Sequence, residues 1–407
     1  MFPTPPSVET RASWIIATVA LVIIAMAFGA AWIIAVGLKD IAAEVDGIRS
    51  IPSLAASLAW LGSGVGGLLM GWIAERVGVR WTAMFGALMI GIGLALSTLG
   101  PSVPLYVGHG LFIGLLGIAG INAPLYVYVS RWFDRRRGSA LALISSGSYI
   151  AGALWPPAFE RAIATMGWRE TMLWYGALQI VIIVPLAAIF LKPPPEAPPP
   201  PVVTGTALDK PRVFGWPPNV TFGLVLGASF LCCIPMAMPQ NHLVAFCSDL
   251  GISASLGALM LTVLLGTAFL SRQIWGLISD RIGGLRTALL GSALQALAML
   301  AFVFTQGELG LLTVSAAFGL GFSGVIPAYV LALRELFPPH EASWRIPALL
   351  LCTGTGMATG GWLAGYLYDY FGNYAPAFAA GVAFNVINLA ILVTLVTRQR
   401  LTTAAAG

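Results

Sequence analysis

Twelve long apolar runs restrict the fold of this 407-residue chain more than any other feature of its sequence. About 20 apolar residues in a helix cross the hydrocarbon core of a membrane, and a helix satisfies its own backbone hydrogen bonds there. Only 9% of the residues are charged, against about 25% in soluble proteins. The sequence therefore predicts an all-α membrane protein. The predicted spans are residues 14–38, 52–74, 82–100, 104–130, 138–160, 171–192, 217–246, 253–279, 285–305, 308–334, 344–368 and 374–397.

A proline-rich break divides these runs into two groups of six. Between Lys192 and Trp216 the chain reads PPPEAPPPPP followed by polar residues, and such a stretch favours extended backbone that cannot pack a core. We therefore predict an N-terminal six-helix bundle over residues 1–192, a linker over 193–216 and a C-terminal six-helix bundle over 217–407.

The lysines and arginines predict the orientation of the spans, because loops on the cytoplasmic side of a membrane are enriched in them. Sixteen fall on one side, with the linker, and four (Lys39, Arg49, Arg161 and Arg169) on the other. We expect a multi-pass plasma-membrane protein with both termini and the linker cytoplasmic. The sixteen are Arg11, Arg76, Arg80, Arg131, Arg135, Arg136, Arg137, Lys192, Lys210, Arg212, Arg281, Arg286, Arg334, Arg345, Arg398 and Arg400.

A short motif, G-x-x-x-[D/E]-R-x-G, occurs in the loop after span 2 and again in the equivalent loop after span 8. Its glycine would allow helices to approach closely, and its acid and arginines could pair with each other and with helix ends as the two halves move. Whether these residues act as conformational switches or only anchor the topology stays open. They are Gly71, Glu75, Arg76 and Arg80 in the first half and Gly276, Asp280, Arg281 and Arg286 in the second.

This repeat resembles the signature loop of the major facilitator superfamily, although Glu75 stands where aspartate is more usual. The resemblance covers essentially the whole chain. It implies the major facilitator fold, with twelve transmembrane helices in two six-helix bundles around a central cavity.

Further strings are similar to those of monocarboxylate-type transporters, a group that includes bacterial lactate and oxalate/formate carriers. Together they imply a small carboxylate as the transported substrate. The strings are Trp132-Phe-Asp-Arg-Arg-Arg137-Gly, Gly167-Trp168-Arg169, Gln240-Asn-His242-Leu, and Gly365-Tyr-Leu-Tyr-Asp369 with Gly372-Asn-Tyr374.

Arg272 is the one cation that falls on neither face of the predicted membrane protein. It precedes Asp280 by eight residues, so it lies roughly 12 Å deep in a core about 30 Å thick. A charge there costs about 2.5–3.5 kcal/mol on insertion scales, and no Asp or Glu lies at that depth. Its planar fork suits a carboxylate, so we predict an anion site, with pairing to helix carbonyls or internal water as the alternative.

The resemblance implies the same role, because related carriers place a span-8 arginine at the substrate carboxylate. Three departures matter. Ala268 replaces an aspartate that couples protons in the animal carriers, and Trp32 aligns with their span-1 lysine. Thr353 and Thr355 lie on span 11, where the oxalate carrier has a second cation. A single cation favours a monoanion as the substrate.

Six further residues are candidates for the substrate site, and for each of them a packing or bridging role stays open. Asn122 lies at a depth similar to that of Arg272, and a buried amide needs polar partners. The tyrosines would offer a hydroxyl and a ring wall, and two span-1 aromatics could cover the substrate's tail. The candidates are Asn122, Tyr126, Tyr149, Tyr329, Trp32 and Phe28.

His242, near the outer end of span 7, is the candidate coupling residue, because imidazole titrates near neutral pH. An interfacial role for it is the alternative. Pro235 and Pro239 should kink the same span and provide a gating bend.

These features predict a monomeric carboxylate transporter that works by alternating access, as a proton symporter or as an anion exchanger. Its partners would be the carboxylate, the bilayer and, in symport, protons, with no nucleic acid and no cofactor. An exporter of drugs or amphipathic compounds is the alternative, since spans 5 and 11 are rich in glycine. The spans contain no catalytic acid pair, activated nucleophile, metal cluster or phosphate loop, which argues against an enzyme.

Overall fold

The computed structural model describes residues 9–194 and 213–404, and within these ranges the chain is helical without any strand. The predicted linker, residues 193–216, lies largely outside the described residues. The helices are α1 (Arg11–Val36), α2 (Leu38–Ala43), α3 (Ser50–Val77), α4 (Val79–Ser97), α5 (Val103–Tyr106), the π-helix η1 (Val107–Ile118), α6 (Ala119–Ser130), α7 (Arg137–Ser145), α8 (Gly147–Phe190), α9 (Pro218–Asp249), α10 (Ala254–Ile282), α11 (Gly284–Phe304), α12 (Glu308–Phe322), α13 (Val325–Leu336), α14 (Pro339–Phe371) and α15 (Ala375–Ala404).

Twelve predicted spans are found as helices. Ten described segments are long and apolar enough to cross a membrane by length and composition. One of them, Gly138–Phe190, contains two predicted spans, and the chain turns between them at Gly167, where φ is 82° and ψ is 165°. Glycine adopts positive φ without steric cost. The one predicted span that is not among these ten segments, residues 344–368, corresponds to α14. All twelve predicted spans are therefore helical, and the all-α fold is confirmed.

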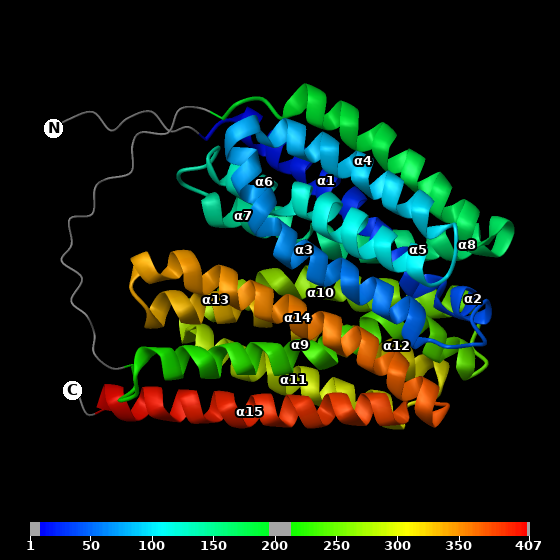
Figure 1. Cartoon of the computed structure of the whole chain (residues 1–407). Coiled ribbons are helices and arrows are strands. Elements are labelled where there is room, and N and C mark those ends of the chain that lie inside the picture. The colour runs from blue at the N-terminus through cyan, green and yellow to red at the C-terminus, as the bar shows by residue number, and fades with distance from the viewer. Residues whose placement is uncertain (1–8, 195–212, 405–407) are drawn as a thin grey trace.

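Helices α1–α8 form one group and α9–α15 a second, and Figure 1 shows the two groups facing each other across the molecule. We call them the N half and the C half. Where they meet, α3 packs on α14, α8 on α10 and α1 on α9. Any residue between the halves must therefore project from one of these helices or from a neighbour of theirs.

The two ends of the bundle differ in how the halves meet. We call the end where α1 begins and α8 ends the linker side, and the opposite end, where α1 ends and α9 ends, the far side (Figure 1). Among the described residues, most hydrogen bonds and all ion pairs between the halves lie on the far side, such as Lys39 with Asp249 and Ser255 with Glu160. The molecule is thus held closed at its far side.

The repeated motif lies on the linker side, and one expectation for it is not met in this conformation. A Cβ atom added at Gly71 or Gly276 would meet nothing within 4 Å. Glu75 and Asp280 are exposed and make no ion pair among the described residues. In this conformation the structure therefore does not show the predicted close helix approach at either glycine of the motif.

Candidate functional site

Arg272 lies on α10 and reaches across to the N half. Its guanidinium carbon is 5.1 Å from the centroid of the Tyr149 ring on α8, and the side chain of Tyr126 on α6 also interacts with its charge. Arg272 is partly exposed and makes no ion pair in the part of the chain that the structure describes. An aromatic face attracts a cation weakly, and the Tyr149 hydroxyl also accepts a hydrogen bond from Arg272. The structure thus brings together three of the predicted site residues.

Asn122 extends this cluster along α6. It precedes Tyr126 by four residues, so the two side chains lie on the same face of the helix. Asn122 is partly exposed and has no hydrogen bond among the described residues, whereas the Tyr126 hydroxyl interacts with Ser145. The free amide of Asn122 can donate to an oxygen atom or accept from a hydroxyl.

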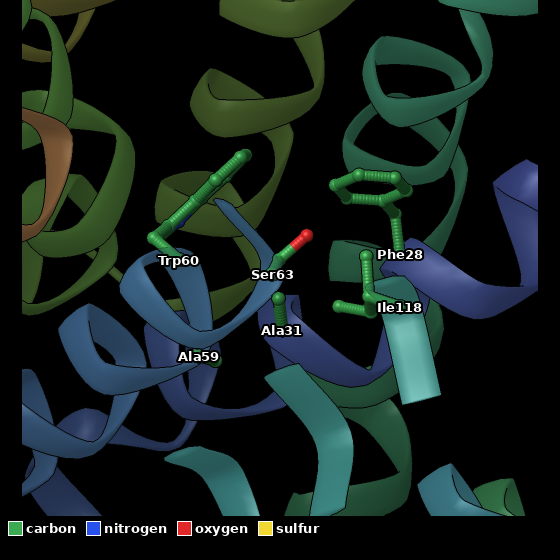
Figure 2. A pocket seen from close by; sticks show the side chains of 6 residues that line it. All are labelled: Phe28, Ala31, Ala59, Trp60, Ser63 and Ile118. Carbon is green, nitrogen blue, oxygen red and sulfur yellow. The ribbon is translucent and has the colours of Figure 1, made fainter. Parts of the chain in front are cut away.

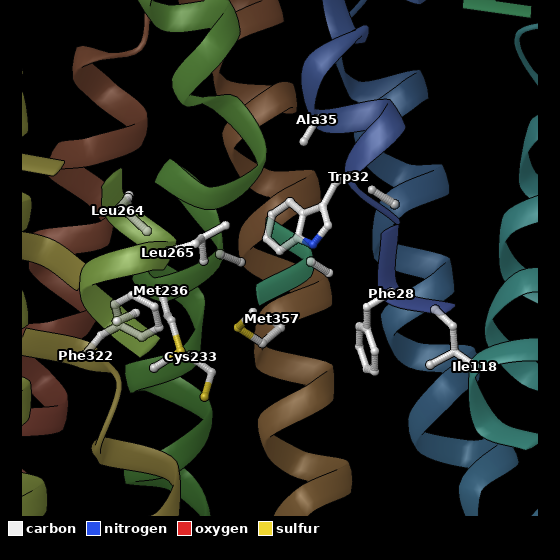
Figure 3. Close-up of a cluster of buried hydrophobic side chains, with 14 of the residues drawn as sticks. Phe28, Trp32, Ala35, Ile118, Cys233, Met236, Leu264, Leu265, Phe322 and Met357 are labelled. Carbon is white, nitrogen blue, oxygen red and sulfur yellow. The ribbon is translucent and has the colours of Figure 1, made fainter. Parts of the chain in front are cut away.

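Trp32 on α1 lies between the halves with an unused donor. Its side chain is only 4% exposed, and its indole Nε1 has no hydrogen-bond partner among the described residues. Figure 3 shows the ring near Leu265 of α10 and Met357 of α14. A buried donor without a partner costs about 1–3 kcal/mol, so Trp32 offers an N–H at the same place where an apolar lid was predicted.

Phe28 lies one turn before Trp32 and is 5% exposed. Its ring centroid is 5.8 Å from that of Trp60 on α3, and both residues line a narrow crevice (Figure 2). The other lining residues are Ala31, Ala59, Ser63 and Ile118. The crevice has no room for a water molecule in this conformation, so a group bound there would require Phe28 or its neighbours to move.

Tyr329 requires a correction. It is fully buried within the C half, and its hydroxyl donates a hydrogen bond to Oδ1 of Asn388 at 2.8 Å. The structure therefore does not bring Tyr329 to Arg272, and this location argues against the predicted contact with substrate. Depth along a span gave no information on which face of α13 the ring occupies.

His242 lies apart from the Arg272 cluster, in the far-side contact between the halves. Its Nε2 is 2.8 Å from the carbonyl oxygen of Gly361, and its Nδ1 is 2.9 Å from the hydroxyl of Tyr374. Since a carbonyl only accepts, Nε2 donates, and Nδ1 of a neutral ring accepts from Tyr374. Ser53 of the N half lies 3.4 Å from Nε2, so His242 touches both halves.

The sequence did not predict the ionic contact that closes the far side. Arg49 binds Asp249 through two parallel hydrogen bonds, Nη1 to Oδ2 at 2.5 Å and Nη2 to Oδ1 at 2.6 Å. Lys39 Nζ lies 3.1 Å from Asp249 Oδ1. Asp369 accepts the backbone N–H groups of Arg49 and Ser50 at 2.7 and 2.9 Å. We call Lys39, Arg49, Asp249 and Asp369 the far-side cluster.

Arg49 is the centre of this cluster and is only 5% exposed. Burial alone would lower the pKa of its guanidinium, but the hydrogen bonds to Asp249 and Tyr374 outweigh that effect and raise the pKa. Arg49 therefore stays charged. A count of lysines and arginines placed Arg49 on the far side, but its partner is 200 residues away in the chain, and no local pattern connects the two.

Comparisons with known proteins agree with this architecture. A family model described as Major Facilitator Superfamily matches residues 19–246 and 225–406. Monocarboxylate transporter 13 of Bos taurus is 25% identical over 348 residues, which are 85% of this chain and 79% of that protein. Monocarboxylate transporter 11 of Homo sapiens is 26% identical over 410 residues, 93% of this chain and 83% of that one. A solved bacterial homolog of the human lysosomal transporter Spinster, inward-facing and unoccupied, superposes with a TM-score of 0.71 at 16% identity and covers 96% of this chain and 98% of that one.

Proposed function

The chain belongs to the Major Facilitator Superfamily, and we propose that it transports a small organic monocarboxylate, whose carboxylate Arg272 binds. Its relatives include proteins named monocarboxylate transporters, which makes it a transporter and not an enzyme. The observation that carries the proposal is Arg272 itself. It is a partly exposed cation at the contact between the halves, without a carboxylate partner among the described residues.

We propose that the linker side is cytoplasmic. Sixteen of the 21 lysines and arginines fall on that side of the predicted membrane protein, as the enrichment of such residues in cytoplasmic loops requires. With this orientation, the far-side cluster closes the external mouth, and the conformation is inward-facing. Alternating access would then require the Arg49–Asp249 contact to break when the external mouth opens.

Arg272 and Trp32 together support a monoanion as the substrate. The guanidinium would hold the carboxylate by two parallel hydrogen bonds, and the free indole N–H of Trp32 could donate to a substrate oxygen. Trp32 aligns with a lysine of related carriers, so here a neutral donor replaces a second positive charge. Asn122 would bind a hydroxyl or keto oxygen, and Phe28 would contact the apolar remainder.

A thermal-shift screen tests the proposal directly. We expect monocarboxylates such as lactate and phenylacetate to raise the melting temperature of the purified protein. Arg272→Ala should lose that shift, whereas Arg161→Ala, which removes an exposed arginine, should keep it. Stabilisation that persists unchanged in Arg272→Ala would contradict carboxylate binding by this residue.

Trp32→Phe tests the unused donor. The change removes the N–H and keeps an aromatic ring, so we expect about three- to tenfold weaker carboxylate binding, the value of about one hydrogen bond. The smaller ring leaves a cavity that destabilises the unliganded protein, but loss of a buried donor without a partner offsets part of this cost, so we expect only a small change in melting temperature. Isothermal titration and melting of the same samples measure both quantities, and unchanged affinity would leave Trp32 as a packing residue.

We propose that a proton enters transport through His242. Neutral His242 accepts from the Tyr374 hydroxyl, and this oxygen also accepts from Nη1 of Arg49 at 3.0 Å. A protonated ring can only donate, so the Tyr374 oxygen would face two cations. The charges that face His242 are those of Arg49 and Asp369. Protonation would therefore weaken the contact that closes the far side.

His242→Gln in proteoliposomes tests this coupling. An inward proton gradient should stimulate carboxylate uptake by the original protein several-fold, because protonation favours opening toward the acidic side. The glutamine keeps hydrogen-bonding capacity but cannot carry the proton, so counterflow should persist while the response to the gradient disappears. If the gradient has no effect on the original protein and internal substrate accelerates uptake, the protein is an anion exchanger.

A further inference from the structure

The carboxylate of Asp249 is bound in the far-side cluster much as a free carboxylate would be. It receives two parallel hydrogen bonds from Arg49, at 2.5 and 2.6 Å, and lies 3.1 Å from Nζ of Lys39. This is the bidentate geometry that makes arginine the preferred partner of carboxylates. Both cations come from the N half, and the carboxylate comes from the C half.

A second carboxylate of the C half uses backbone donors of the same region. Asp369 accepts the N–H groups of Arg49 and Ser50, where α3 begins. The first N–H groups of a helix lack partners within the helix and attract anions. The N half therefore presents side-chain and backbone donors for carboxylates at one place, and the C half supplies the acceptors.

Most partners of the two cations come from the C half, although Lys39 also interacts electrostatically with Asp40 of its own half. The side-chain partners of Arg49 in the described structure are Asp249, the Tyr374 hydroxyl and the Tyr368 ring, whose centroid is 3.6 Å from the guanidinium carbon. Lys39 donates to Ser248 at 2.9 Å and pairs with Asp249. When the halves part at this side, Arg49 and Lys39 lose these partners together.

We propose that Lys39 and Arg49 form a second carboxylate-binding site, which captures the incoming monocarboxylate at the external mouth before it reaches Arg272. The inference rests on the proposed function and orientation. In the open state the substrate carboxylate takes the position that Asp249 occupies here. When the mouth closes, Asp249 returns to the two cations and displaces the substrate inward. Lys39 and Arg49 thus bind the substrate in addition to closing the far side.

The experiment compares Lys39→Met with Asp249→Asn, using external lactate and phenylacetate as probes in intact cells that express the full chain. Both changes weaken the closed far side. If the far-side cluster only held the far side closed, both variants would favour the outward-open state and lower the external KM. The proposed site predicts opposite shifts, because Asp249→Asn leaves both cations and removes their competitor, whereas Lys39→Met removes a cation that binds the probe.

We expect Lys39→Met to raise the external KM about two- to fivefold, as expected for one charge contact in a partly exposed pair, and Asp249→Asn to lower it. Lys39→Arg keeps the charge and should therefore raise KM less than Lys39→Met does. Arg161→Ala removes another far-side cation and should leave KM unchanged, which separates local binding from general attraction of anions.

An external KM that falls or stays constant in Lys39→Met would overturn the inference. The far-side cluster would then only close the far side. Surface labelling measures how much of each variant reaches the membrane. Because KM does not depend on the amount of transporter, poor folding of a variant cannot imitate either result. Uptake of neither probe by the original protein above the level of Arg272→Ala would overturn the proposed function, and the inference with it.

Discussion

Arg272→Ala is expected to lower carboxylate uptake by about 100-fold or more, since removing one partner of a buried, hydrogen-bonded charge pair costs about 2–5 kcal/mol. No other cation lies near the cluster of Arg272, Tyr126 and Tyr149 among the described residues. The substrate carboxylate would then enter the space between the halves without a counter-charge. Initial rates of labelled lactate and phenylacetate counterflow in proteoliposomes measure the loss.

Arg272→Lys is the matched control for this prediction. Lysine keeps the positive charge but cannot form two parallel hydrogen bonds, so we expect uptake between that of the original protein and that of Arg272→Ala. Equal loss of uptake in both variants would indicate that the substrate requires the two parallel hydrogen bonds of arginine and not only its charge. Full activity of Arg272→Ala, with normal amounts of protein in the liposomes, would show that the substrate binds elsewhere.

Gly360→Ala is expected to destabilise the C half strongly. A Cβ atom at Gly360 of α14 would lie 2.7 Å from the carbonyl carbon and 2.8 Å from the Cα atom of Ile234 on α9. Backbone atoms of a packed helix cannot move aside as a flexible side chain can, and overpacking of a core costs about 1–3 kcal/mol or more. We expect a melting temperature lower by about 4 °C or more, measured on the detergent-purified protein.

Gly227→Ala provides the opposite case on α9. A Cβ atom there would meet nothing within 4 Å, and alanine is favoured over glycine within a helix by about 1 kcal/mol. We therefore expect an unchanged or slightly higher melting temperature. If Gly360→Ala also leaves the melting temperature unchanged or raises it, helix propensity and not the close approach of α14 to α9 controls stability at Gly360.

Much of the candidate site could be found without the structure, because the depth of a residue in the membrane follows from counting residues from the end of its span. The position of Arg272, eight residues before Asp280, and the similar depth of Asn122 follow from counting along a span. Tyr126 and Tyr149 were found in the same way, and both interact with Arg272. The same argument selected Tyr329, which is bonded to Asn388 inside the C half, because depth does not specify the rotation of a helix.

The sequence by itself determined the spans, the all-α fold and the family, because hydropathy, helix length and short motifs are properties of neighbouring residues. Only the tertiary structure decided which faces meet. It left the indole N–H of Trp32 without a partner and placed His242 in contact with Gly361 and Tyr374. It also joined Arg49 to Asp249 across 200 residues. These contacts depend on how the two bundles rotate and tilt against each other. That orientation is set by packing between residues far apart in the chain, so it cannot be predicted from any single span.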